Sequence, residues 1–232
     1  MIKALIFDVD GILAETEEAH RRAFNDTFEF FHLDWYWSKE TYHKLLRITG
    51  GKERMRAYQK AHPNGLRTLQ DPEIRAIYKA KMRRYRDLLS EGLLSLRAGV
   101  KELIAHALHR GLRLAIATTA KRPHVEALCR SCWGQEADEI FEVVAACEDM
   151  GHKGPESNLY DLALDRLGLT AQECLAFEGS QSGIASAKAA GLAVYATPSL
   201  YCQQDDLSAA DWVSDHIKPD HILAITTGKA GP

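Results

Sequence analysis

The fold of this chain is decided by residues 4–11, which read Ala-Leu-Ile-Phe-Asp-Val-Asp-Gly. The apolar run 4–7 predicts a parallel strand, because a strand that is buried on both faces is apolar throughout. Asp8 and Asp10 follow this strand directly, and Gly11 then allows a turn. Open α/β sheets bind their ligands at the carboxyl ends of the strands. The stretch therefore predicts that both carboxylates lie at a ligand-binding edge.

Two carboxylates at this spacing have a plain interpretation and a functional one. The plain interpretation is a helix cap followed by a solvated turn aspartate. In the functional interpretation, Asp8 and Asp10 repel each other and raise each other's pKa unless a cation lies between them. The segments downstream, which match the same kind of site, favour the functional interpretation.

Residues from about 15 to 92 are expected to be nearly all helical, because apolar residues recur at helical spacing in 19–31, 42–48 and 74–89. Gly50 and Gly51 are expected to end the second of these helices, and residues 51–54 to open another. Asp71 is expected to cap the helix that contains residues 74–89, with Pro72 at its first helical position. The block predicts a helical cap inserted just after the first strand.

From Gly99 onward the chain alternates between helical and strand patterns. We expect helices near 100–111, 125–132, 159–167 and 180–191, and strands at 114–117, 141–146, 174–177, 193–196 and 212–213. Such alternation indicates a parallel sheet with helices on both faces. The predicted fold is therefore α/β, a doubly wound parallel sheet of residues 1–14 and 93–232, with an all-helical cap domain of residues 15–92.

Composition excludes several classes of protein. A net charge of -3 over 232 residues argues against a nucleic-acid binder, which would carry a basic face. No apolar run approaches ~18 residues, so no membrane span is expected. Met1 leads almost directly into the first strand, so we expect no signal peptide. We also expect a cytoplasmic location and a monomer. The five cysteines suit reduced thiols, and packing explains Cys129 and Cys132 better than zinc or redox use.

At residues 8–12 the chain resembles the haloacid-dehalogenase superfamily of phosphotransferases, whose first motif is DxDx(T/V). Further segments resemble the CbbY-type phosphatases of that superfamily, which remove a phosphate from xylulose 1,5-bisphosphate, an inhibitor of the Calvin-cycle enzyme Rubisco. These segments are 7–11, 14–17, 20–25, 34–37 and 50–54. The resemblance runs over nearly the whole chain and implies a Rossmann-like core with a cap.

The resemblance implies roles for residues at four strand ends. Asp8 would attack phosphorus and form an aspartyl-phosphate, while Asp10 would protonate the leaving oxygen and later activate water. Thr118 would hold the transferring phosphoryl group, with the helix that starts near Arg122 directed at it. The expected cofactor is Mg²⁺, bound by Asp8, the backbone carbonyl of Asp10, and Glu178.

Three positions depart from the family pattern. Ile12 occupies the position at which the family has Thr. Gly179 follows Glu178 and occupies the position at which the family's fourth motif has a second carboxylate. The family lysine before proline is replaced by Gly154, with Lys153 one residue early as its candidate substitute. Each lost electrostatic group typically costs ~100- to 1000-fold in rate. The chain is therefore expected to be a weakened catalyst, unless Glu148, Asp149, Lys121 or Lys153 compensate.

Substrate recognition is expected to lie in the cap and in the loop after Thr118. Arg54 is the candidate for bidentate contact with a distal phosphate, and His20 is expected to pack rather than react. The segment 35–37, Trp-Tyr-Trp, suits either hinge packing or a sugar platform. The full set of expected substrate-binding residues is Glu17, Gly50, Gly51, Lys52, Glu53, Arg54, Lys81, Thr119, Lys121, Arg122 and His124.

The function expected from these residues is Mg²⁺-dependent hydrolysis of a small phosphorylated sugar enclosed between cap and core. Two alternatives stay open. A phosphotransferase resembling β-phosphoglucomutase would share the fold and the nucleophile but return the phosphoryl group to a sugar. A catalytically degenerate relative would bind a sugar phosphate or a protein partner without turnover, and the departures at Ile12, Gly154 and Gly179 motivate it.

Overall fold

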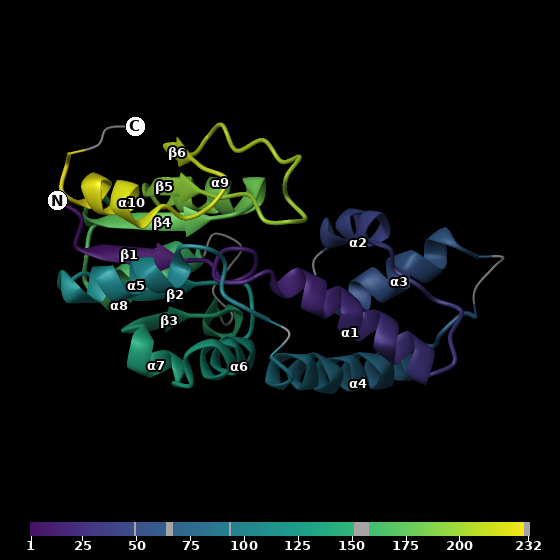
Figure 1. Ribbon diagram of the computed structural model, residues 1–232. Coiled ribbons are helices and arrows are strands. Elements are labelled where there is room, and N and C mark those ends of the chain that lie inside the picture. The colour runs from purple at the N-terminus through teal and green to yellow at the C-terminus, as the bar shows by residue number, and fades with distance from the viewer. Residues whose placement is uncertain (49, 64–66, 93, 151–157, 230–232) are drawn as a thin grey trace. The chain divides into compact units, whose positions relative to one another are not determined.

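The computed structural model describes residues 1–232 except 49, 64–66, 93, 151–157 and 230–232. Its centre is a parallel sheet of six strands in the order β3-β2-β1-β4-β5-β6, which confirms the predicted fold class (Figure 1). The strands are β1 (Ala4–Phe7), β2 (Arg113–Ala117), β3 (Val143–Ala145), β4 (Cys174–Glu178), β5 (Ala193–Ala196) and β6 (Trp212–Val213).

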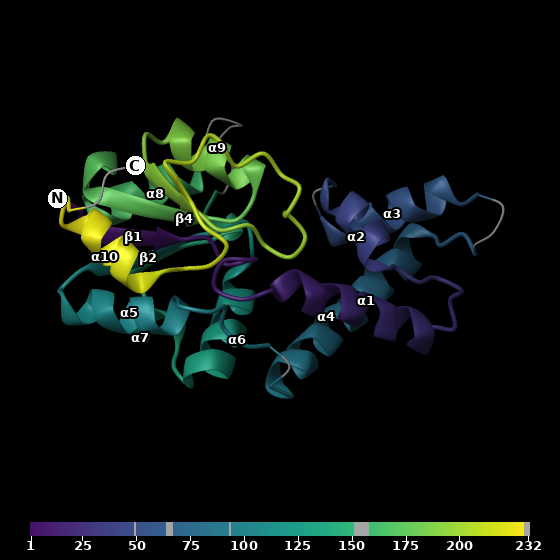
Figure 2. The same ribbon diagram turned by 45° about the horizontal axis from the view of Figure 1, so that its top comes forward.

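Helices cover both faces of the sheet, as the alternating sequence pattern predicts. Figures 1 and 2 show α5 and α10 on one face and α8 and α9 on the other. The helices of this part are α5 (Val100–His109), α6 (Arg122–Trp133), α7 (Ala137–Ile140), α8 (Leu159–Leu167), α9 (Gln181–Ala189) and α10 (Pro219–Thr226), with the 3-10 turns η1 (Cys147–Met150) and η2 (Ala171–Glu173).

Strand β1 lies in the middle of the sheet and all four of its side chains are buried. Its register pairs Phe7 with Ile116 of β2 and with Phe177 of β4, and the rings of Phe7 and Phe177 stack with centroids 4.5 Å apart. The residues that follow these three strands therefore emerge side by side at one edge of the sheet. This edge carries Asp8, Thr118 and Glu178.

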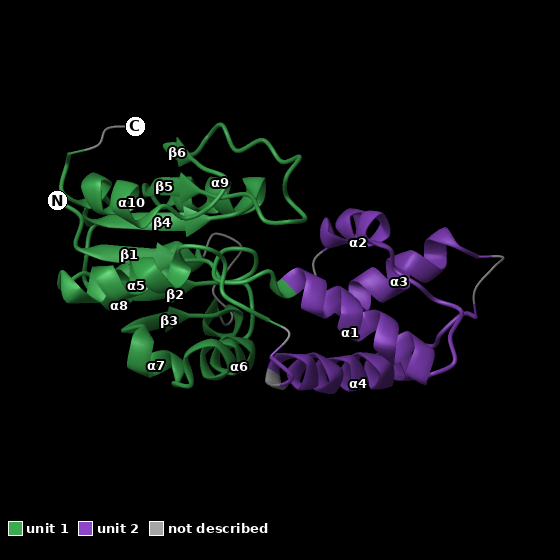
Figure 3. Cartoon of the chain, in the orientation of Figure 1, with its two compact units in different colours: residues 1–16, 94–232 green, residues 17–93 purple. Residues whose placement is uncertain are grey.

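The chain divides into two compact units (Figure 3). Unit 1 contains residues 1–16 and 94–232, and unit 2 contains residues 17–93. Unit 2 consists of helix α1 (Thr16–Phe30), apart from its first residue, with α2 (Lys39–Leu46), α3 (Gly51–Ala61) and α4 (Asp71–Ser90). The functional division into core domain (1–14, 93–232) and cap domain (15–92) stays a prediction.

The interior of unit 2 is aromatic, and it corrects one expectation. Trp37 is fully buried and Trp35 is 3% exposed. Trp37 packs with Phe24 at a centroid distance of 4.4 Å and with Phe28 at 5.0 Å. Neither hinge packing nor a sugar platform describes these two tryptophans, because both side chains belong to the core of the helical unit. Tyr36, between them, points outward and is exposed.

Sequence signals for helix caps predicted some helix ends correctly and others wrongly. Ser180 caps α9, as expected, by accepting a hydrogen bond from the Gly183 N–H at 3.1 Å. The cap of α4 is Gln70, not Asp71, because the Glu73 carboxylate accepts the Gln70 N–H and completes a capping box. Helices α7 and α10 were not predicted.

The structure bears on the predictions about membrane spans and about the cysteine thiols. None of the helices in the described ranges has both the length and the apolarity that a membrane crossing requires. Cys129 is buried in α6, and burial raises the pKa of its thiol to about 12. A thiol held this firmly in its neutral form is a poor nucleophile and a poor metal ligand at neutral pH.

Candidate active site

The candidate site begins with Asp8, directly after β1. The Asp8 backbone N–H donates to the Phe177 carbonyl at 3.1 Å, which extends the ladder between β1 and β4 by one residue. Burial raises the pKa of the Asp8 carboxyl well above its usual range, and the neighbouring carboxyls of Glu178 and Asp10 raise it further. The Thr118 hydroxyl and the Val9 N–H oppose this rise by hydrogen bonding. A cation at this edge would relieve the mutual repulsion of the carboxylates.

Glu178 ends β4, and its carboxylate accepts hydrogen bonds from two neighbouring groups. The Tyr160 hydroxyl of α8 donates to Oε1 at 2.5 Å, and the Gly179 N–H donates to Oε2 at 3.1 Å. Burial raises the pKa of Glu178 to about 7, although these hydrogen bonds favour its ionised form. The carboxylate lies over Gly183, where an added Cβ would fall 2.0 Å from Oε2. Gly183 thus leaves the space that the Glu178 carboxylate occupies.

Asp10 lies in a tight loop between β1 and α1. The Thr16 hydroxyl donates to Asp10 Oδ1, and the Gly11 N–H donates to the Ala14 carbonyl at 2.8 Å. Gly11 adopts a φ of 80°, and a Cβ there would lie 2.3 Å from Ser199 Cβ. Only glycine fits this turn without strain or a clash. The loop therefore keeps Asp10 near the end of β1, and its carboxylate contributes to the raised pKa of Asp8.

Thr118 follows β2 and is buried, and its hydroxyl oxygen accepts the Ala120 N–H at 3.2 Å. Thr119 and Lys121 are exposed, and Lys121 caps helix α6 through its extended backbone. The Arg122 guanidinium donates to the Val144 carbonyl at 3.0 Å and pairs with Asp138 at 3.3 Å. This loop places Thr118 beside Asp8. The Arg122 side chain instead contacts β3 and α7.

His124 and the acidic residues of η1 give little independent support to a phosphate site. His124 is half-buried in the first turn of α6. Glu148 accepts the backbone N–H of Arg122 at 3.2 Å, and Asp149 pairs with Arg166 at 3.1 Å. These contacts explain Glu148 and Asp149 as local structural residues. The roles of Thr119, Lys121, Arg122 and His124 in binding stay predictions.

Within unit 2, several expected binding residues converge around Tyr42. The Tyr42 hydroxyl donates to Glu17 Oε2 at 2.6 Å. Arg54 lies 4.0 Å from Glu17 and 3.4 Å from the Tyr42 hydroxyl, and its Nε donates to the Ile48 carbonyl at 3.0 Å. The Arg54 guanidinium is therefore oriented by groups from α1, α2 and the following turn. An oriented guanidinium is suited to bidentate contact with an anion.

The start of α3 lies against this cluster. Gly50 has a φ of 94°, and a Cβ there would meet the Glu53 carboxylate at 2.2 Å. Glu53 also pairs with Arg56 at 3.1 Å, and Lys52 is half-buried in the first turn. A Cβ on Gly51 would approach Tyr78 to 2.5 Å and Phe24 to 3.0 Å. The paired glycines thus permit close packing at this helix start.

Lys81 of α4 is a buried lysine surrounded by aromatic rings. Its Nζ lies 4.6 Å from the Phe24 ring centroid and 5.3 Å from that of Tyr85, and 2.7 Å from His20 Nδ1. His20 stacks on Tyr85 with centroids 3.8 Å apart, so it packs as expected while also contacting Lys81. The cation–π contacts compensate part of the cost of burying the ammonium group.

Comparison with known proteins agrees with this geometry. A family model for haloacid dehalogenase-like hydrolases matches residues 2–191. The chain belongs to this family. It is 53% identical to Protein CbbY of Rhodobacter capsulatus over 211 residues, which cover 91% of this chain and 92% of that protein. These findings confirm the resemblance noted in the sequence and the expectation of a hydrolytic enzyme.

Two solved structures extend the similarity to the fold. CbbY from Rhodobacter sphaeroides in complex with phosphate matches with a TM-score of 0.83 at 44% identity, covering 93% of this chain and 95% of that one. A variant of that protein in complex with xylulose 1,5-bisphosphate matches with the same TM-score, identity and coverage. The hydrolase described here therefore shares its fold with CbbY over nearly its full length.

Within this hydrolase, the departures at Ile12 and Gly179 lie against each other. A Cβ on Gly179 would fall 3.2 Å from Ile12 Cδ1 and 3.2 Å from the Thr197 carbonyl oxygen. Ile12 is fully buried, so its larger side chain lies where a residue at position 179 would begin. Lys153 and Gly154, the other expected departure, lie outside the described residues.

The sequence did not identify three residues that shape this site. Tyr160 and Gly183 hold and accommodate the Glu178 carboxylate, and Thr16 holds that of Asp10. Tyr160 occurs in an ordinary amphipathic helix, where its spacing indicates only burial. Thr16 is the first residue of α1, and a threonine at a helix start has a local explanation as well. Both contacts join parts of the chain that sequence spacing does not connect.

Proposed function

We propose that this hydrolase is a phosphatase for a small phosphorylated sugar, with a bisphosphate such as xylulose 1,5-bisphosphate as the preferred class. The observation that carries the proposal is the group of Asp8, Asp10, Thr118 and Glu178 at the carboxyl ends of three adjacent strands. Its support from the comparisons is that a solved relative of the same fold is described with xylulose 1,5-bisphosphate.

The proposed reaction has two steps. Asp8 Oδ attacks phosphorus, the bond to the sugar oxygen breaks, and Asp10 transfers its proton to that oxygen. The resulting aspartyl-phosphate is then attacked by water, which gives a proton back to Asp10 and releases phosphate. The hydrogen bond from Thr16 would orient Asp10 for both transfers, and that from Thr118 would stabilise the ionised form of Asp8.

The oxygen donors at this edge would suit a Mg²⁺ ion by their chemistry, although the described residues include no group of three or more acidic, histidine or cysteine side chains placed to hold a metal. Asp8, the Asp10 carbonyl and Glu178 supply oxygen ligands, which this hard cation prefers. Burial is the largest cause of the raised pKa values of Asp8 and Glu178, and a neighbouring cation would oppose that rise. When bound, Mg²⁺ would neutralise charge on the phosphoryl oxygens and keep Asp8 ionised. Gly179 contributes no ligand.

The cap cluster would supply specificity. Arg54, oriented by Glu17 and Tyr42, is proposed to bind the phosphate that is not transferred. The glycine pair at 50 and 51 would complete the same recognition site, with the buried Lys81 as a further candidate. The further candidates lie in the first turn of α3 and in the loop and first turn at α6: Lys52, Glu53, Thr119, Lys121, Arg122 and His124.

The test is a phosphate-release assay of the full chain on a panel of sugar mono- and bisphosphates, with and without Mg²⁺. We expect Mg²⁺-dependent release, fastest with a bisphosphate, and none from the Asp8→Asn variant. Conversion of a hexose 1-phosphate into its 6-phosphate would instead support the phosphoglucomutase-like alternative. Binding of the sugar phosphates without any turnover would support the degenerate alternative, which the missing carboxylate at Gly179 favours.

A further inference from the structure

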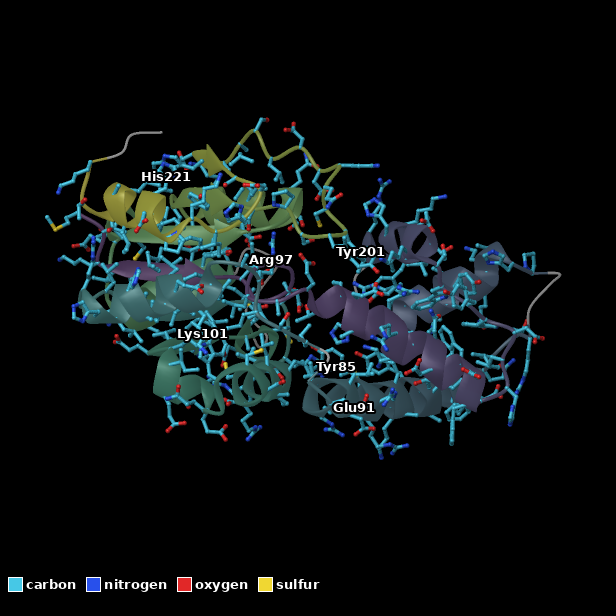
Figure 4. The ribbon with its side chains drawn as sticks, in the orientation of Figure 1. Tyr85, Glu91, Arg97, Lys101, Tyr201 and His221 are labelled. Carbon is cyan, nitrogen blue, oxygen red and sulfur yellow. The ribbon has the colours of Figure 1, made fainter. Side chains whose placement is uncertain are left out.

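Arg97 makes an unusual number of polar contacts at the catalytic edge of unit 1. Its side chain is only 13% exposed. The guanidinium donates to the Gly11 carbonyl, to the Thr197 carbonyl and hydroxyl at 3.2 Å each, and to the Pro198 carbonyl at 2.9 Å. Arg97 is labelled in Figure 4, within the green and purple ribbons of the core. One side chain thus bonds two loops that are far apart in the sequence.

Glu15 completes the link. Its Oε1 lies 3.3 Å from Arg97 Nε, and its carboxylate accepts the Leu200 N–H at 3.1–3.2 Å. The backbone of the same segment is also paired, since the Arg97 N–H donates to the Leu13 carbonyl at 2.8 Å. The loop 9–15 is therefore fixed to the loop 197–200 at Gly11 and again at Glu15.

Asp10 precedes the first of these anchor points by one residue. On its other side, Asp8 is fixed by the hydrogen bond to the Phe177 carbonyl. The backbone at Gly11 lies close to the second loop, because a Cβ there would fall 2.3 Å from Ser199 Cβ. The position of the Asp10 carboxylate thus depends on how firmly the peptide after it is held.

A lysine could not reproduce these contacts. The planar guanidinium offers five donors in a fixed arrangement, while an ammonium group is a compact point charge. Burial lowers the pKa of Arg97, and the nearby Glu15 carboxylate opposes that change. Without the guanidinium, three backbone carbonyls would lose donors in a partly buried site, which is costly. The hydrogen bonds of the Arg97 guanidinium to the two loops explain why a charged group is buried here.

We propose that Arg97, oriented by Glu15, is a positioning residue that holds the Asp10 loop in the geometry needed for proton transfer to the leaving group. This inference rests on the proposed phosphatase function. Arg97 exchanges no atoms with the substrate, and the proton that moves is that of the Asp10 carboxyl. The effect of substituting Arg97 should therefore depend on how strongly the leaving group needs protonation.

The test compares two leaving groups in wild type and Arg97→Lys. A sugar phosphate leaves as a basic alkoxide and needs a proton, whereas p-nitrophenyl phosphate leaves as a stable phenolate. The value of kcat/KM reports steps up to formation of the phosphoenzyme. General acid catalysis contributes ~100- to 10000-fold, so Arg97→Lys should lower kcat/KM at least ~10-fold for the sugar phosphate and less than ~3-fold for the aryl ester. Equal losses, or no loss, would overturn the proposal.

Two variants keep the test decisive. Glu15→Gln, which leaves the carbonyl contacts of Arg97 in place, should shift the ratio of the two kcat/KM values in the same direction by a smaller factor. If Arg97→Lys fails to fold, an unchanged ratio in Glu15→Gln overturns the proposal. Arg113→Lys is the matched control, because Arg113 forms a bidentate pair with Glu142 at the opposite end of β2, and its ratio should not change.

A readout without turnover separates this inference from the proposed function. Amide exchange at Gly11 and Leu13, whose N–H groups donate within the loop, should be at least ~10-fold faster in Arg97→Lys or Glu15→Gln than in Arg113→Lys, since lost anchoring raises local opening. Unchanged exchange contradicts the positioning role even if the wild type hydrolyses neither ester. Absence of hydrolysis with accelerated exchange contradicts only the proposed phosphatase function.

Discussion

Restoring a carboxylate at position 179 should increase activity, but only if Ile12 is reduced at the same time. The backbone of Gly179 lies outside the left-handed region, so a side chain there is not strained by conformation. The obstacle is space, because the new Cβ would lie 3.2 Å from Ile12 Cδ1 and from the Thr197 carbonyl oxygen. Ile12→Val removes the Cδ1 atom and leaves the rest of the side chain.

The expected magnitudes follow from these contacts. Overpacking a core typically costs ~1–3 kcal/mol, so Gly179→Asp alone should lower the free energy of unfolding by about that amount. Ile12→Val alone should cost ~0.5–1.5 kcal/mol, yet in the double variant it should recover part of the loss. A regained electrostatic group is worth ~100- to 1000-fold in rate. The double variant should therefore raise kcat/KM about 100-fold and lower the Mg²⁺ concentration needed for half-maximal rate.

The assay is steady-state phosphate release across a Mg²⁺ titration, with unfolding measured on the same preparations. Gly179→Asn combined with Ile12→Val is the matched control, because it has nearly the same volume without the charge. If the asparagine variant gains as much as the aspartate variant, packing rather than charge is responsible. If the unaltered chain is already as fast as the double aspartate variant, other residues have replaced the missing ligand and the reasoning is wrong.

Three further predictions concern Arg54, Glu178 and Gly183. Arg54→Ala should raise KM more for a bisphosphate than for a monophosphate, by a loss of ~1.5–3 kcal/mol, whereas Arg56→Ala on the same helix should not discriminate. Because burial raises the pKa of Glu178 from 4.5 to about 7, the native state holds a proton that the unfolded chain releases. The Mg²⁺-free protein should lose up to ~3 kcal/mol of stability as pH rises from 4.5 through 7, and denaturant titrations should show Glu178→Gln flattening part of this change and Mg²⁺ restoring stability at pH 8. Gly183→Ala should displace the Glu178 carboxylate, which an added Cβ would meet at 2.0 Å, and an activity assay should show a lower kcat with an unchanged circular dichroism spectrum.

Much of the fold was predictable because its signals are local. The run 4–7 is apolar on both faces, and the alternation after Gly99 specifies a parallel sheet. Helix α8 and strand β5 have the predicted bounds, since each is a clearly bounded apolar segment. The cap of α4 was misassigned because Asp71 is the preferred capping residue by type, and only the hydrogen bond from the Gln70 N–H to Glu73 shows that the cap lies one residue earlier.

The site was less predictable because its decisive contacts are long-range. The sequence predicted Asp8 and Asp10 from the strand that they follow, and Glu178 from the family resemblance at the end of another strand, and these roles stay predictions. It did not indicate that Tyr160 would bond Glu178, or that Ile12 would occupy the space beside Gly179. For the two buried tryptophans at 35 and 37, hinge packing and a sugar platform both stayed open, because a short aromatic run has no periodicity that indicates burial in a helical core. Such contacts depend on register and packing between elements.

The central claim is that Asp8 is the nucleophile of a phosphatase, and its phosphorylation can be measured directly. The chain would be mixed with a sugar bisphosphate and Mg²⁺, quenched in acid within the first turnover, digested, and examined by mass spectrometry. We expect a phosphoryl group on the peptide that contains Asp8, bound to that residue, and none in the Asp8→Asn variant. Phosphate release by Asp8→Asn at the wild-type rate, or a phosphoryl group on another residue, would contradict the claim.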